Sequence, residues 1–148
     1  MDKITLSIIS GSTSDKHIVD NITEVLNKFE IKHETKIISA HRNPLELRKY
    51  VKNSKSDIFI AVAGMAAHLP GVIASFTIKP VIGVPVSSKL SGIDALLSIV
   101  QMPTGVPVAT VAIDGGKNAA LLAVQILSLN NANLKEKLIS YRKDLAGV

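Results

Sequence analysis

The chain has 148 residues, of which 47% are hydrophobic and only 3% aromatic, and its net charge is +5. We therefore expect a single domain, residues 1–148, with an aliphatic core. The lack of cysteine excludes disulfides, thiol catalysis and thiolate metal sites, and the basic residues are too scattered to predict a nucleic-acid surface.

The first element is a strand over 3–10 that is apolar on both faces, which is typical of a central parallel strand covered by helices. It is too short to span a membrane and no small-residue cleavage site follows, so we expect a cytoplasmic protein without a membrane partner. Apolar residues at helical spacing then run from Ile18 to Phe29, with Ser14 or Asp15 as the natural N-cap.

Strands and helices alternate through the rest of the chain. The pattern predicts strands over 33–39, 58–63, 81–86 and 106–113, and helices over 44–54, 70–76, 92–101, 116–129 and 131–145. Such alternation favours an α/β three-layer sandwich with a flavodoxin-like, five-stranded parallel sheet and an extra C-terminal helix. We expect that last helix to reach onto a neighbouring subunit, since it has little left to cover in one chain.

Small and polar residues follow three of the strands. They form a first loop (11–15), a second loop (39–42) and a third loop (63–68). Because ligands of parallel α/β sheets bind outside the carboxyl ends of the strands, we expect these loops to meet at one rim.

The second loop carries the residues best suited to chemistry. A strand ending in the apolar pair Ile37-Ile38, expected to be buried, delivers His41 and Arg42 just before a helix opens at Pro44. A titratable imidazole beside a permanent cation suits an anionic ligand and a proton transfer. The alternative is a helix-capping loop with a solvated arginine and a histidine without a function.

The first loop offers a glycine, Gly11, for close backbone approach, and the hydroxyls of Ser12 and Ser14. Together with free N–H groups at a helix start, these predict a site for a phosphate or a ribose edge. Asp15 would repel a phosphate, so ribose hydroxyls are the more sensible ligand for it. The sequence lacks the dinucleotide and P-loop motifs, and plain helix capping is the alternative interpretation.

The third loop is built from small residues, Gly64, Ala66 and Ala67, followed by His68. Small side chains would let the backbone approach a flat or compact ligand, although tight helix–sheet packing is an equal alternative. His17 and His33 are expected to be solvated, and Asp114 to lie in a turn. No spacing of His, Asp or Glu predicts a metal site, and no serine lies in a nucleophile elbow.

Four motifs, in colinear order between Ile4 and about Leu129, closely resemble the carboxyaminoimidazole ribonucleotide mutase family of purine biosynthesis, also called the catalytic subunit of phosphoribosylaminoimidazole carboxylase. They are Gly11-Ser12-Thr13-Ser14-Asp15, Ser39-Ala40-His41-Arg42-Asn43-Pro44, Ala66-Ala67-His68-Leu69-Pro70-Gly71 and Leu97-Ser98-Ile99-Val100-Gln101-Met102-Pro103. Met65 departs from the pattern, since a glycine is usual there.

The resemblance implies an isomerase that converts N5-carboxyaminoimidazole ribonucleotide to 4-carboxy-5-aminoimidazole ribonucleotide without metal, organic cofactor or ATP. It also implies a homo-octamer whose sites are completed by neighbouring chains. A separate ATP-dependent synthetase that supplies the substrate is a further candidate partner. A related branch carboxylates aminoimidazole ribonucleotide directly with CO2, and this reaction is the alternative.

Carried over by position, the resemblance makes His41 the general acid and base. It assigns substrate binding to residues of the first two loops: Gly11, Ser12, Ser14, Asp15, Ser39, Ala40 and Arg42. The third loop and the residue after it would enclose the carboxylate or the CO2 derived from it, through Gly64, Ala67, His68 and Leu69.

Overall fold

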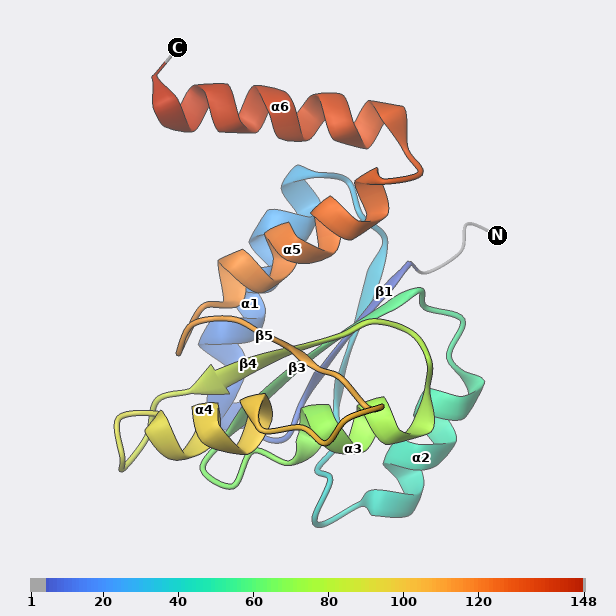
Figure 1. Cartoon of the computed structure of the whole chain (residues 1–148), viewed down its shortest axis with the longest axis vertical. Helices are drawn as coiled ribbons and strands as arrows, with labels where there is room; N and C mark the ends of the chain where they lie inside the picture. Colours follow the sequence, from blue (N-terminus) through green and yellow to red (C-terminus); the bar gives the residue numbers. More distant parts are fainter. Residues whose placement is uncertain (1–4, 148) are drawn as a thin grey trace.

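The computed structural model describes residues 5–147 and contains one parallel sheet with the strand order β2-β1-β3-β4-β5 (Figure 1). Residues 3 and 4 of the first predicted strand lie outside the described residues. The strands are β1 (Leu6–Ser10), β2 (His33–Ile37), β3 (Ile58–Gly64), β4 (Val81–Val86) and β5 (Ala109–Thr110). The predicted α/β class and the parallel sheet are confirmed.

Helices cover both faces of the sheet. They are α1 (Lys16–Lys28), α2 (Pro44–Asn53), α3 (Leu69–Phe76), α4 (Ile93–Val100), α5 (Gly116–Ser128) and α6 (Ala132–Ala146), with a 3-10 turn, η1 (Thr13–Asp15), before α1. One apolar core lies between the sheet and α1 and α5, and a second lies between the sheet and α2, α3 and α4 (Figure 1). Strands β1, β3 and β4 are buried along their whole length or nearly so, as expected for strands covered on both faces.

The prediction of a buried second strand was wrong. All five residues of β2 are partly or fully exposed, and Ile37 is 56% exposed. The reason is the strand order, because β2 lies at the edge of the sheet and pairs only with β1. Ile38, just after the strand, is buried.

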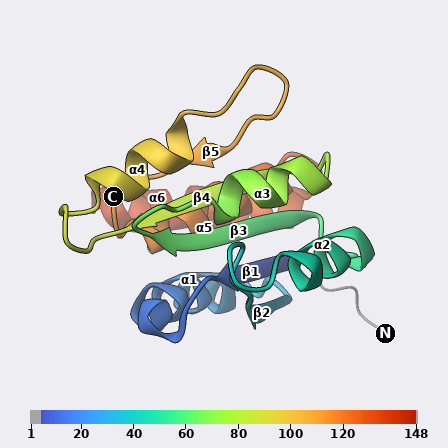
Figure 2. The same cartoon turned by 90° about the horizontal axis from the view of Figure 1, so that it is seen from below.

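The fifth strand is much shorter than the predicted 106–113. Only Ala109 and Thr110 pair with β4, at Ile82 and Gly83. Pro107, inside the predicted strand, lacks the N–H that a sheet ladder needs, which suits a loop better than a strand. Figure 2 shows the connection between α4 and β5 as a loop that projects from the body.

The last helix packs on its own chain. Leu134 and Leu138 are buried against the first core, and the ring of Tyr141 meets Phe29 edge to face at 5.6 Å. Figure 1 shows α6 lying across the end of α5, away from the sheet. Within residues 5–147 no helix is long and apolar enough to cross a membrane.

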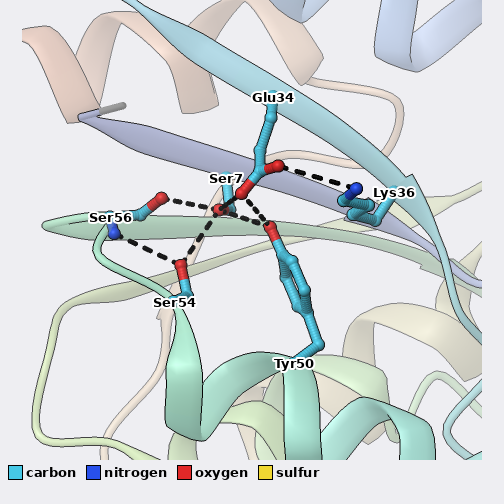
Figure 3. A network of polar contacts seen from close by, with 6 residues as sticks. All are labelled: Ser7, Glu34, Lys36, Tyr50, Ser54 and Ser56. Atoms are coloured by element: carbon cyan, nitrogen blue, oxygen red, sulfur yellow. Dashed lines mark hydrogen bonds and ion pairs between the residues drawn. The ribbon is translucent and has the colours of Figure 1, made fainter. Parts of the chain in front are cut away.

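A network of hydroxyl groups joins β1, β2 and α2 (Figure 3). Ser7 is fully buried, and its Oγ lies 2.6 Å from the Oγ of Ser56 and 2.7 Å from the phenol oxygen of Tyr50. That phenol donates a hydrogen bond of 2.7 Å to Glu34 Oε1. Pairing satisfies the buried serine, whose hydroxyl would otherwise be costly inside the core.

We expect Tyr50→Phe to lower the free energy of unfolding by about 1–2 kcal/mol, because the buried Ser7 and the partly buried Glu34 lose one hydrogen bond each. Burial raises the pKa of Tyr50 above its ordinary value, so the phenol stays protonated. The loss should therefore be constant between about pH 6 and pH 9. Urea unfolding measures it. Tyr141→Phe is the matched control, and an equal loss in both variants would contradict the role of the network.

Candidate functional site

A cavity of about 670 Å³ lies at the carboxyl ends of the first four strands, β1 to β4. Four loops line it: the three predicted ones and a fourth loop, 87–88, which follows β4. The volume is in the range of sites that hold small organic ligands, which is roughly 300–1,000 Å³. The predicted convergence of the three loops is confirmed.

Most of the predicted site residues line this cavity: Gly11, Ser12, Ser14, Asp15, Ser39, Ala40, His41, Arg42, Gly64, His68 and Leu69. Ala67 does not, since it is 1% exposed and packs in the core between the sheet and α3. Small size at this position thus serves helix–sheet packing, which was the alternative interpretation.

Sequence reasoning missed several lining residues. His17, which was expected to be solvated, is exposed but also lines the cavity, as do Ser87 and Ser88. Met65 of the predicted third loop lines it as well. The two serines directly follow the buried strand β4, so the rule that found the other loops could have found this one.

Ser12 organises the first loop. Its hydroxyl accepts a hydrogen bond of 3.2 Å from the backbone N–H of Ser14 and so caps η1. The predicted cap of α1, Asp15, stands at the N-cap position without a side-chain cap bond. Asp15 is buried, and this burial raises the pKa of its carboxyl, against lowering contributions from Ser14 and His17.

We expect Asp15→Asn to raise the melting temperature at neutral pH. Because the pKa of Asp15 is raised on folding, the folded protein holds this proton more tightly than the unfolded chain, and stability falls as the pH rises through the acidic range. An amide of the same shape never bears the charge. The gain should be present at about pH 7 and vanish at about pH 3, where wild-type Asp15 is protonated in both states. Thermal unfolding at both pH values measures this, and a lower melting temperature of the variant at pH 7 would contradict it.

The second loop is a tight turn that precedes α2. The backbone N–H of Asn43 donates to the carbonyl of Ser39 at 2.9 Å, and that of Arg42 donates to Ser39 Oγ at 3.2 Å. Helix α2 begins at Pro44, as predicted. The guanidinium of Arg42 donates from Nη2 to the carbonyl of Gly11 at 3.1 Å, so this cation connects the first and second loops.

The third loop brings His68 to His41. Met65 adopts a left-handed backbone conformation, with φ of 51°, which favours glycine. Two further bonds tighten the loop: Ala67 N–H to the Met65 carbonyl and His68 N–H to the Ala66 carbonyl, both 2.8 Å. His68 Nδ1 then lies 2.8 Å from His41 Nε2.

The fourth loop is held by Asp114, which lies in a turn as predicted. The carboxylate Oδ1 of Asp114 accepts a hydrogen bond of 2.9 Å from the backbone N–H of Ser87. Asp114 also has a left-handed conformation, with φ of 60°. This residue is therefore fixed between the fourth loop and the start of α5.

The arrangement suits an anionic ligand and acid–base chemistry. Arg42 supplies a permanent cation, five serines line the cavity wall, and His41 and His68 can carry protons. Among residues 5–147 no group of three or more His, Cys, Asp or Glu side chains could hold a metal ion.

Comparisons with known proteins agree with this chemistry. Residues 5–147 match the model of a family described as AIR carboxylase. The N5-carboxyaminoimidazole ribonucleotide mutase of Methanocaldococcus jannaschii is 56% identical over 140 residues, covering 95% of this chain and 89% of the relative. The enzyme of the same name from Pyrococcus abyssi is 54% identical over 144 residues, covering 95% and 83%. The crystal structure of Treponema denticola PurE superposes with a TM-score of 0.86 at 30% identity, covering 97% of this chain and 92% of that one.

Proposed function

The chain belongs to the AIR carboxylase family, and on this premise we propose that it is an N5-carboxyaminoimidazole ribonucleotide mutase. It is an isomerase of purine biosynthesis that moves a carboxylate from an exocyclic nitrogen to a ring carbon. The observation that carries the proposal is the cavity in which His41 and Arg42, adjacent in sequence, face the serines of the first loop. That arrangement offers one group for proton transfer and another for a phosphate.

The ligand's parts are assigned by charge. Arg42 takes the phosphate, because its guanidinium is permanently charged and can donate two parallel hydrogen bonds. Ser12 and Ser14 donate hydroxyl hydrogen bonds beside it, and Asp15 accepts from ribose hydroxyls. The small residues of the third loop enclose the carboxylate.

The reaction needs one proton transfer to the exocyclic nitrogen and a second proton transfer away from the ring carbon. The N–carboxylate bond breaks to release CO2, and His41 protonates the exocyclic nitrogen. The adjacent ring carbon then attacks the CO2, and His41 takes the proton that the ring carbon loses. Imidazole suits both steps because its reference pKa is about 6.5, and holding CO2 beside the carbon is a proximity effect.

The proposal also includes the oligomeric state and the cellular location of the protein. We expect a cytoplasmic homo-octamer, supplied with substrate by a separate ATP-dependent synthetase. The outer face of α4 supports an assembly, since Ile93, Leu97 and Val100 are each about half exposed, at 52%, 49% and 49%. Analytical ultracentrifugation tests the octamer, and a monomer at micromolar concentration would contradict it.

Turnover without added metal or ATP tests the function. N5-carboxyaminoimidazole ribonucleotide should be converted rapidly, whereas aminoimidazole ribonucleotide with bicarbonate should react slowly. Efficient use of the second pair of reactants would instead place the protein with the enzymes that carboxylate directly. A folded protein that converts neither would contradict both reactions.

A further inference from the structure

His68 of the third loop and His41 of the second loop form a hydrogen bond. His68 Nδ1 lies 2.8 Å from His41 Nε2, and the ring centroids are 4.8 Å apart with the planes at 84°. Only one of the two nitrogens can donate in such a bond, and the other must accept. The tautomer of each ring is therefore coupled to that of the other.

The backbones on both sides of this bond are anchored. His41 lies inside the turn closed by the bond from Asn43 N–H to the Ser39 carbonyl. His68 is bonded at both ends, from its N–H to Ala66 and from Val72 N–H to its carbonyl, at 2.8 and 2.9 Å. The two loops follow β2 and β3, which pair with opposite edges of β1, so the sheet itself sets their separation.

We propose that His68 is a positioning residue for His41, an inference that rests on the proposed function. The bond to His68 occupies Nε2 of His41, which leaves Nδ1 as the nitrogen available to the substrate. It also holds the imidazole ring, which is otherwise exposed, in one orientation. His68 acts on the reaction through this bond and touches neither reacting atom.

The hydrogen bond between His68 and His41 also provides a path for proton transfer. This route requires a starting state in which His41 carries its proton on Nδ1 and His68 is an imidazolium that donates from Nδ1. As His41 Nδ1 protonates the exocyclic nitrogen, the proton on His68 Nδ1 passes to His41 Nε2, and His41 stays neutral. When Nδ1 removes the proton from the ring carbon, the shared proton returns to His68, and the starting state is restored.

Two substitutions of His68 distinguish its hydrogen bond to His41 from the space that its side chain fills. Asparagine places an amide near the position of Nδ1 and keeps a hydrogen-bond partner for His41, whereas leucine fills similar space without a polar atom. We expect His68→Leu to lower kcat by roughly 100-fold, with KM changed less than about 3-fold. His68→Asn should recover at least about 10-fold of that loss by restoring the orientation, although an amide cannot pass on the proton.

Nitrogen-15 NMR of the imidazole rings supplies the second measurement. The Nε2 and Nδ1 signals of His41 should shift in His68→Leu and remain close to wild type in His68→Asn. Unchanged His41 signals in His68→Leu would overturn the proposal, as would a raised KM with an unchanged kcat, which would make His68 a substrate contact. If the wild-type protein fails to convert N5-carboxyaminoimidazole ribonucleotide, the proposed function fails, and the NMR comparison alone decides whether His68 positions His41.

Discussion

His41→Asn is expected to lower turnover of N5-carboxyaminoimidazole ribonucleotide by about 1,000-fold or more, the range of effects for a general acid and base. Asparagine cannot take up or release a proton near neutral pH, so both proton transfers lose their carrier. The substitution leaves the rest of the cavity wall in place, because Arg42 keeps its hydrogen bond to the Gly11 carbonyl. The affinity for aminoimidazole ribonucleotide, measured by calorimetry, should therefore change by less than about 3-fold.

The matched control for this variant is His33→Asn. His33 lies on the edge strand β2, away from the cavity, and its Nδ1 is 2.7 Å from the carbonyl of Ile31. The same substitution there should leave turnover unchanged. A large loss of ribonucleotide affinity in His41→Asn would contradict the separation of catalysis from binding.

Arg42→Ala is expected to weaken ribonucleotide binding by about 30- to 150-fold, which corresponds to about 2–3 kcal/mol for charge-assisted hydrogen bonds to a phosphate. Two effects add up. The phosphate loses its cation, and the bond from Nη2 to the Gly11 carbonyl no longer connects the first and second loops. Calorimetry at low and high salt measures the loss, which should shrink as salt screens the interaction in the wild-type protein.

Arg48→Ala serves as the control for Arg42. Arg48 lies on the exposed face of α2, with its guanidinium 6.0 Å from the ring of Phe76, outside the cavity. Its removal should leave the affinity within about 2-fold of the wild type, as for an ordinary surface substitution. Arg42→Lys should fall between, because lysine keeps the charge without the planar pair of donors. An unchanged salt dependence in Arg42→Ala would contradict a phosphate at this position.

The residues themselves determined much of the fold. Apolar periodicity predicted the order of the strands and helices, and the bounds of β4 matched exactly the predicted 81–86. Small and polar residues after successive strands predicted where the cavity would lie, because parallel strands end at a common edge. The resemblance of four motifs then pointed to the family that the comparisons confirmed.

Only the tertiary structure decided which strand lay at the edge and which loops faced each other. The sequence of β2 looks buried at Ile37-Ile38, yet the strand order leaves one of its sides without a partner. The same order places the loops after β2 and β3 on either side of β1, and this brings His41 within 2.8 Å of His68, 27 residues away. A contact between two loops depends on strand pairing far from either residue, so local sequence could predict the two histidines but not the bond between them.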